Sequence, residues 1–177
     1  MAEANKTYLS EQGLAKAKEI IARYPAGRQK SALLPILHLV QDENQNSLTT
    51  ESMNYVADLL QIKPVEVYEV ATFYTMYNLK PVGKHVLEFC RTGPCCLVGA
   101  EDIIAYTENK LGIKDGETTP DGEFSIKCME CLGACGYGPM MQVGEYYYEH
   151  LTTDRIDHLL SEFKKGNRPV EESKLKF

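Results

Sequence analysis

The residues best suited to chemistry are the cysteines, and all six lie between positions 90 and 135. The first group reads Cys90-Arg-Thr-Gly-Pro-Cys95-Cys96, and the second reads Cys128-Met-Glu-Cys131-Leu-Gly-Ala-Cys135. A C-x4-C pair and a C-x3-C pair on two short loops can each present two thiolates toward one point. A 2Fe-2S cluster requires two thiolates on each iron. The spacing therefore indicates an iron–sulfur cluster.

Spacing alone also permits a zinc-stabilised interaction module. Cys128 and Cys131 form a C-x2-C pair, and Cys90 with Cys95 could supply the other half, since zinc accepts both C-x2-C and C-x4-C spacings. A third class, the thiol–disulfide oxidoreductases, requires C-x2-C at the end of the first strand, where this chain has C-x4-C. The zinc alternative stays open at this level.

The neighbours of the first cysteines suit anionic sulfur. Gly93 permits a sharp turn and Pro94 fits the first turn of a helix, so we expect Cys95 at a helix N-terminus, where the backbone dipole favours a thiolate. Cys96 and Cys128 fall outside the pattern, and we expect both to be structural, because free cysteine behaves as a small buried hydrophobe. Core or surface roles are also expected for the histidines, which are His38, His85, His150 and His158.

The sequence around these cysteines resembles a known family. Four stretches carry the resemblance: the run from Glu130 to Cys135 followed by Gly-Tyr-Gly-Pro-Met-Met, the earlier Cys90-x4-Cys95, and the upstream segments 71–78 and 81–85. They are similar to the thioredoxin-like 2Fe-2S subunit of NADH-quinone oxidoreductase, which is respiratory complex I. The resemblance covers nearly the whole chain. It implies a thioredoxin-like 2Fe-2S domain in which Cys90, Cys95, Cys131 and Cys135 hold one 2Fe-2S cluster.

The same resemblance implies an electron-transfer subunit. Its cluster would exchange electrons with the flavin of an NADH-oxidising partner subunit that carries FMN and NADH, within a peripheral arm of further subunits. An equivalent subunit of an NAD-linked hydrogenase or formate dehydrogenase is the alternative within this class. The Cys90–Cys95 loop lacks the G-x-G-x-x-G spacing of a dinucleotide-binding turn, so we expect no complete active site on this chain alone.

Composition limits the choice of partners and compartment. The chain has 177 residues, 44% of them apolar, and a net charge of −6, which disfavours nucleic acid and anionic lipid as main partners. Neither a membrane-spanning apolar run nor the apolar region of a signal peptide is visible in the sequence. We therefore expect a cytoplasmic protein, peripheral to the inner membrane, in which cysteines bind metal rather than form disulfides.

Periodicity predicts helices throughout residues 1–80. Their expected N-terminal signals are Ser10, Ser31, Thr49 or Thr50, and Pro64. This region either supports the rest of the fold or docks a partner. Its aromatic-rich end, with Phe73, Tyr74, Met76 and Tyr77, favours docking, because aromatic residues and methionine are enriched in interface cores.

Alternation after Pro81 predicts an αβ domain over residues 81–166. Its expected elements are a strand over 84–89, a helix from Pro94 to about Leu111, a strand over 124–128, a hairpin around Gly144-Glu145, and a last helix capped by Thr153 and ending at Gly166. Residues 167–177 form a polar tail. The predicted class is α+β, with an N-terminal helical region followed by a thioredoxin-like ferredoxin domain.

Overall fold

The computed structural model describes residues 7–169, and the polar tail predicted for 167–177 lies outside them from residue 170 onward. The chain divides after Pro81 into two compact units. Within the described residues, the regular structure of the first unit is helical, and the second unit contains a four-stranded sheet with helices. The predicted α+β class is therefore confirmed. Within the described residues, no helix is long and apolar enough to span a bilayer.

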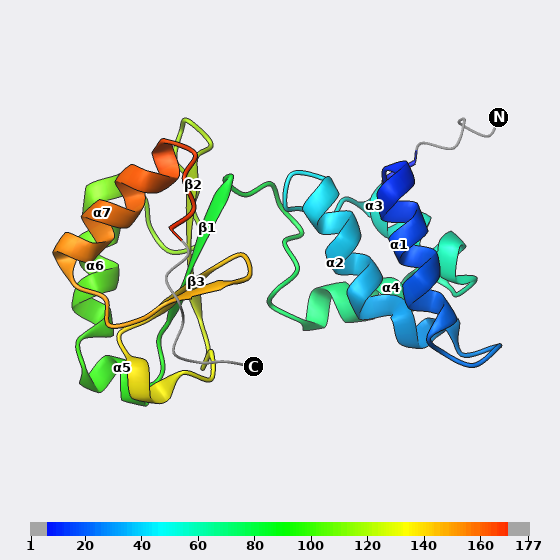
Figure 1. The fold of residues 1–177 in the computed structure, drawn as a ribbon, viewed down its shortest axis with the longest axis horizontal. Coiled ribbons are helices and arrows are strands. Elements are labelled where there is room, and N and C mark those ends of the chain that lie inside the picture. Colours follow the sequence, from blue (N-terminus) through cyan, green and yellow to red (C-terminus); the bar gives the residue numbers. More distant parts are fainter. Residues whose placement is uncertain (1–6, 170–177) are drawn as a thin grey trace. The chain divides into compact units, whose positions relative to one another are not determined.

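From residue 7 to residue 81, the first unit is built from four α-helices and a short 3-10 turn, whose arrangement Figure 1 shows. They are α1 (Glu11–Ala22), η1 (Gln29–Ala32), α2 (Leu33–Glu43), α3 (Thr50–Leu60) and α4 (Pro64–Phe73). Three of the predicted starts are confirmed: the Ser10 side chain accepts from the Gly13 amide, Thr49 forms a capping box with Ser52, and Pro64 opens α4. The first backbone N–H groups of a helix have no hydrogen-bond partner inside the helix. The side chains of Ser10 and Thr49 accept from such groups, and Pro64 has no N–H at this position.

Ser31 does not cap the second helix. It lies inside η1, where its amide donates to the Arg28 carbonyl at 3.0 Å, and α2 begins two residues later with Ala32 as its N-cap. The later start places Pro35 in the first turn of α2, where the missing N–H breaks no helical hydrogen bond.

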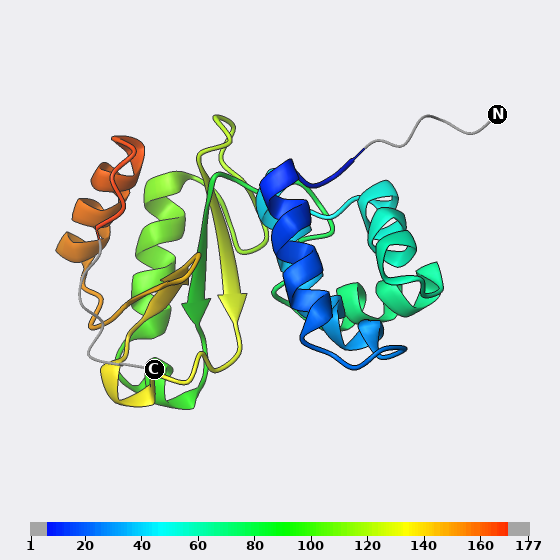
Figure 2. The same cartoon turned by 45° about the vertical axis from the view of Figure 1, so that its right-hand side comes forward.

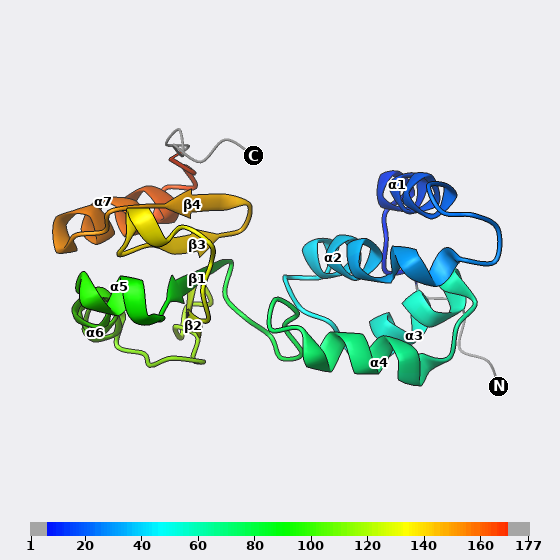
Figure 3. The same ribbon diagram turned by 90° about the horizontal axis from the view of Figure 1, so that it is seen from below.

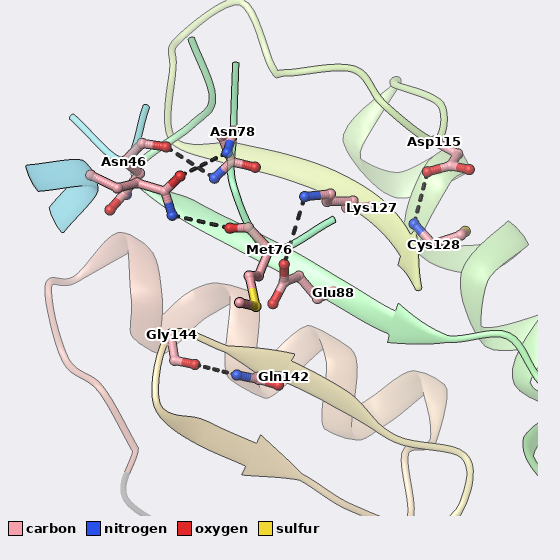
Figure 4. Close-up of polar contacts among 10 residues, drawn as sticks. Asn46, Met76, Asn78, Glu88, Asp115, Lys127, Cys128, Gln142 and Gly144 are labelled. Atoms are coloured by element: carbon pink, nitrogen blue, oxygen red, sulfur yellow. Dashed lines mark hydrogen bonds and ion pairs between the residues drawn. The ribbon is translucent and has the colours of Figure 1, made fainter. Parts of the chain in front are cut away.

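The segment that follows α4 is fixed to α2 by one buried side chain. The Gln41 amide donates to the Met76 carbonyl at 3.1 Å, and its oxygen accepts from the Asn78 amide at 2.7 Å. Figure 4 shows Met76 and Asn78 in this arrangement. These contacts position the aromatic residues just before them, at the end of α4.

The second unit has a mixed sheet in the order β2-β1-β3-β4. Its strands are β1 (His85–Cys90), β2 (Phe124–Met129), β3 (Met141–Val143) and β4 (Tyr146–Tyr148). β1 and β2 are parallel over six paired residues, whereas β3 is antiparallel to β1 and to β4. The predicted strands and hairpin are present, and Gly144 has the positive φ of 61° that a tight hairpin turn requires.

The continuous helix predicted from Pro94 to Leu111 is wrong. The chain forms a short α5 (Gly93–Leu97), breaks at Val98-Gly99, and continues as α6 (Ala100–Leu111). Gly99 has φ 94°, a conformation that is accessible to glycine and costly for other residues. The last helix, α7 (Thr153–Lys164), is capped by Thr152 rather than by Thr153, since the Thr152 side chain accepts from the Arg155 amide.

The two faces of the sheet differ. The helices α6 and α7 lie on one face (Figure 3) and bury one apolar core with Leu87, Phe89 and Ile126. The opposite face carries a polar row across the strands, in which Glu88 pairs with Lys127 on β2 and with Gln142 on β3. Figure 4 shows the ion pair between Glu88 and Lys127, whose charged atoms lie 4.0 Å apart. Tyr147 continues this row on β4, opposite Gln142.

Candidate metal centre

The parallel pairing of β1 and β2 brings the two cysteine groups to one end of the domain. Cys90 is the last residue of β1, and β2 ends at Met129, two residues before Cys131. Figure 2 shows both arrowheads pointing to the end where α5 and the segment around residue 135 lie. α5, which carries Cys95, contacts the short turn η2 (Cys135–Tyr137). The residues predicted as ligands therefore come from two loops at the same edge of the sheet.

Cys90 and Cys95 form a buried pair, with exposed fractions of 2% and 1%. Burial disfavours the Cys90 thiolate, but hydrogen bonds from the Thr92 hydroxyl and from the backbone of Leu132 and Thr92 outweigh it and hold the pKa of Cys90 below its usual value. Burial and the neighbouring Cys90 sulfur raise the pKa of Cys95 to about 12. Without metal, Cys95 keeps its proton near neutral pH, and a bound metal would displace it.

Cys131 and Cys135 form a second pair, and both are exposed. Their sulfur atoms lie 3.5 Å apart, and the interaction with the Cys131 sulfur raises the pKa of Cys135. Two sulfur ligands at about 2.3 Å from one tetrahedral metal ion would be about 3.8 Å apart. The Gly133 amide donates to the Cys131 sulfur at 3.4 Å. This pair is therefore close to the geometry of two ligands on one metal.

The two pairs lie near each other. The Cys135 sulfur acts electrostatically on Cys95, and the Cys90 sulfur acts on Cys135. Among residues 7–169, no three His, Cys, Asp or Glu side chains gather tightly enough to ligate one metal ion. Two separate thiol pairs suit a cluster in which each metal takes two thiolates. A single zinc ion would instead require all of its ligands within about 2.3 Å of one point.

A small apolar cluster supports the site. It contains Cys90, Cys95, Ala100, Ala134 and Met140, with Leu132, Tyr137 and Tyr147 packed against it. Backbone hydrogen bonds fix the second loop beneath it: the His150 amide donates to the Tyr137 carbonyl at 2.9 Å, and the Leu151 amide donates to the Pro139 carbonyl at 2.8 Å. The loops are therefore held by the hairpin side of the domain as well as by β1 and β2.

The remaining cysteines lie beside this arrangement. Cys128 packs against the apolar core between the sheet and its helices, and its amide donates to Asp115 at 2.8 Å (Figure 4). Burial and the nearby Asp115 carboxylate raise the pKa of Cys128 to about 11, which keeps it a neutral thiol. Cys96 follows Cys95 on α5 and is half-buried.

Gly93 lies at the start of α5, directly after the bend at Thr92, in a conformation that other residues also adopt. Its φ is not positive, a Cβ there would meet no atom within 4 Å, and α5 simply begins at this residue. Sequence reasoning missed the role of Tyr147, whose hydroxyl donates to the Leu132 carbonyl at 2.6 Å. Alternation in the hairpin places Tyr147 on the face opposite Tyr148, but it does not identify the loop that Tyr147 reaches.

Comparisons with known proteins agree with this geometry. The family model "Thioredoxin-like [2Fe-2S] ferredoxin" matches residues 17–164. The E subunit of NADH-quinone oxidoreductase from Rickettsia bellii is 44% identical over 154 residues, which are 87% of this chain and 92% of the relative. The same protein of Rickettsia felis is 44% identical over 153 residues, or 86% and 92% of the two chains.

A solved structure shows the same fold. A chain of NAD+-reducing [NiFe]-hydrogenase in the H2-reduced state superposes with a TM-score of 0.67 at 18% identity. The match covers 80% of this chain and 23% of the hydrogenase chain. The thioredoxin-like resemblance stated from the sequence is thus confirmed, and this chain belongs to the thioredoxin-like [2Fe-2S] ferredoxin family.

Proposed function

We propose that this chain is the electron-transfer subunit of an NADH-quinone oxidoreductase and holds one 2Fe-2S cluster. Cys90 and Cys95 would ligate one iron, and Cys131 and Cys135 the other. The observation that carries the proposal is the meeting of two thiol pairs at one sheet edge, in a chain with about the length of its NADH-quinone oxidoreductase relatives. When bound, such a cluster takes up and releases one electron at a time.

The difference in burial between the two pairs suits exchange of electrons with another protein. Cys90 and Cys95 close one side of the site within the apolar cluster, whereas Cys131 and Cys135 are exposed. The exposed side is the shortest route between the site and a redox group on a partner. We propose that this partner is the flavoprotein that binds FMN and oxidises NADH, on the cytoplasmic side of the membrane.

A hydrogenase or formate dehydrogenase remains the alternative parent complex. The similar fold of an NAD+-reducing hydrogenase supports this alternative. The 44% sequence identity, however, is to the E subunit of NADH-quinone oxidoreductase and supports that complex. The proteins that co-purify with the tagged chain distinguish the two: membrane subunits indicate the quinone reductase, and a hydrogenase catalytic subunit indicates the alternative.

Serine substitution tests the ligand set. Replacement of any one of Cys90, Cys95, Cys131 or Cys135 removes a thiolate, and we expect each variant to lose the cluster. The variants Cys96→Ser and Cys128→Ser should keep the cluster, since neither residue belongs to the two thiol pairs. The measurement is iron and acid-labile sulfide per chain in anaerobically prepared protein, with the EPR signal after reduction. Loss of that signal in Cys96→Ser or Cys128→Ser would show that the ligand set is wrong.

Gly138 lies against the first pair. A Cβ at this position would lie 3.1 Å from the Cys95 sulfur and 3.0 Å from the Val98 side chain. The backbone of Gly138 has φ −68°, which alanine adopts freely. Alanine at position 138 would therefore crowd the Val98 side chain and the Cys95 sulfur at a φ that it adopts freely.

We expect Gly138→Ala to retain less iron than the parent, because overpacking of about 1–3 kcal/mol would displace the Cys95 sulfur. Gly136→Ala is the matched control, since a Cβ there meets no atom within 4 Å. The measurement is iron per chain and the rate of bleaching of the visible spectrum in air. Equal retention by both variants would show that a side chain at position 138 does not displace the Cys95 sulfur.

The helical region offers a surface for the partner. Phe73 is 76% exposed and contacts Tyr74 edge-to-face, with ring centroids 5.0 Å apart. Tyr77, by contrast, is buried and donates from its hydroxyl to the Leu34 carbonyl at 3.0 Å. The predicted aromatic cluster thus consists of an exposed part, Phe73 and Tyr74, and a supporting part behind it. We propose that residues 1–80 dock the flavoprotein through the exposed part.

Phe73→Ala should weaken the complex with the flavoprotein. An aromatic interface anchor contributes about 2 kcal/mol, which corresponds to a roughly 30-fold rise in Kd. Val65→Ala is the control, because Val65 is an exposed apolar residue at the opposite end of α4. The measurement is titration of full-length variants with the purified flavoprotein. Identical affinities for Phe73→Ala, Val65→Ala and the parent would place the interface elsewhere on the chain.

A further inference from the structure

One contact outside the cysteines reaches the candidate site. Tyr147 lies on the edge strand β4, and its hydroxyl crosses to the second cysteine loop, where it donates to the Leu132 carbonyl at 2.6 Å. Leu132 directly follows Cys131. The hydrogen bond therefore joins two segments that are 15 residues apart, at the peptide group next to a candidate ligand.

The same peptide group faces a sulfur atom on its other side. The carbonyl of Leu132 and the amide of Gly133 belong to one peptide unit, and this amide donates to the Cys131 sulfur at 3.4 Å. The contacts form a chain that runs from the Tyr147 hydroxyl through the peptide to the Cys131 sulfur. Hydrogen bonds in such a chain polarise one another, so donation to the carbonyl makes the amide a stronger donor.

The sheet holds Tyr147 in place for this contact. Tyr147 pairs with Gln142 on β3, and Gln142 pairs with Glu88 on β1, two residues before Cys90. The ring also packs against the apolar cluster that contains Cys90 and Cys95. A tyrosine hydroxyl is protonated near neutral pH and can donate to the carbonyl.

We propose that Tyr147 is a positioning residue that orients the Leu132–Gly133 peptide toward the Cys131 sulfur and thereby raises the reduction potential of the bound cluster. The inference rests on the proposed cluster function and adds a determinant of its potential. Reduction adds negative charge, and a donor to a ligand sulfur stabilises the reduced state more than the oxidised state. A weaker donor at this peptide therefore shifts the potential to a more negative value.

The test uses the full-length protein with its cluster, assembled anaerobically. Tyr147→Phe removes the hydroxyl and keeps the ring, and we expect a shift of the midpoint potential to a more negative value in a redox titration followed by EPR. Tyr146→Phe is the matched control. Tyr146 precedes Tyr147 on the same strand, but its ring packs on the helical side of the sheet and contacts the Arg168 guanidinium. The cluster of the Tyr146→Phe variant should therefore have the potential of the parent.

A second variant keeps the test decisive if Tyr147→Phe does not retain the cluster. Incorporation of 3-fluorotyrosine at position 147 leaves the shape nearly unchanged and makes the hydroxyl a stronger donor, so the potential should shift to a more positive value. The inference would be overturned if both Tyr147 variants had the potential of the parent. If Tyr147→Phe loses the cluster, an unchanged potential in the fluorotyrosine variant would overturn it as well. A parent protein without a 2Fe-2S spectrum would instead overturn the function on which it rests.

Discussion

The parallel pairing of β1 with β2 is the interaction on which the site depends. Six residues of each strand are in register, from His85 opposite Phe124 to Cys90 opposite Met129. Because parallel strands end at the same edge of a sheet, the loops that follow them meet there. A shift of one residue in this register would turn Cys90 to the helical face and separate the two thiol pairs.

The two faces of the sheet have separate tasks. The helical face buries Leu87, Phe89 and Ile126, which fix the strands and exclude water. The other face carries the Glu88–Lys127 ion pair and continues to Tyr147. Both charges are partly buried, and this burial raises the pKa of Glu88 and lowers the pKa of Lys127. Cys90 lies two residues after Glu88 on the same face, so the first thiol belongs to the small apolar cluster at the site and not to the main core.

Much of this arrangement follows from the sequence. Period-two alternation identifies β1 and β2, and the cysteine spacing identifies two loops that can bind metal. Helix starts are predictable where one side chain decides them, as at Ser10 and Pro64. They are not predictable where neighbours compete. Thr152 and Thr153 are equally good caps by residue type, and in the structure Thr152 is the cap.

The features that sequence reasoning missed depend on tertiary contacts. The break at Gly99 lets α5 contact η2 while α6 packs on the sheet, and a continuous amphipathic pattern does not reveal it. The hydrogen bond from Tyr147 to Leu132 requires the hairpin and the cysteine loop to be adjacent in space. Spacing also leaves the choice between zinc and a cluster open, whereas the paired geometry and the family favour the cluster.

The most direct test of the proposed cluster is the mass of the intact chain, measured by native mass spectrometry after anaerobic purification. Two cysteine pairs that each bind one iron predict a single species with two iron and two inorganic sulfur atoms. A species that carries one zinc ion and no inorganic sulfur would contradict the proposal.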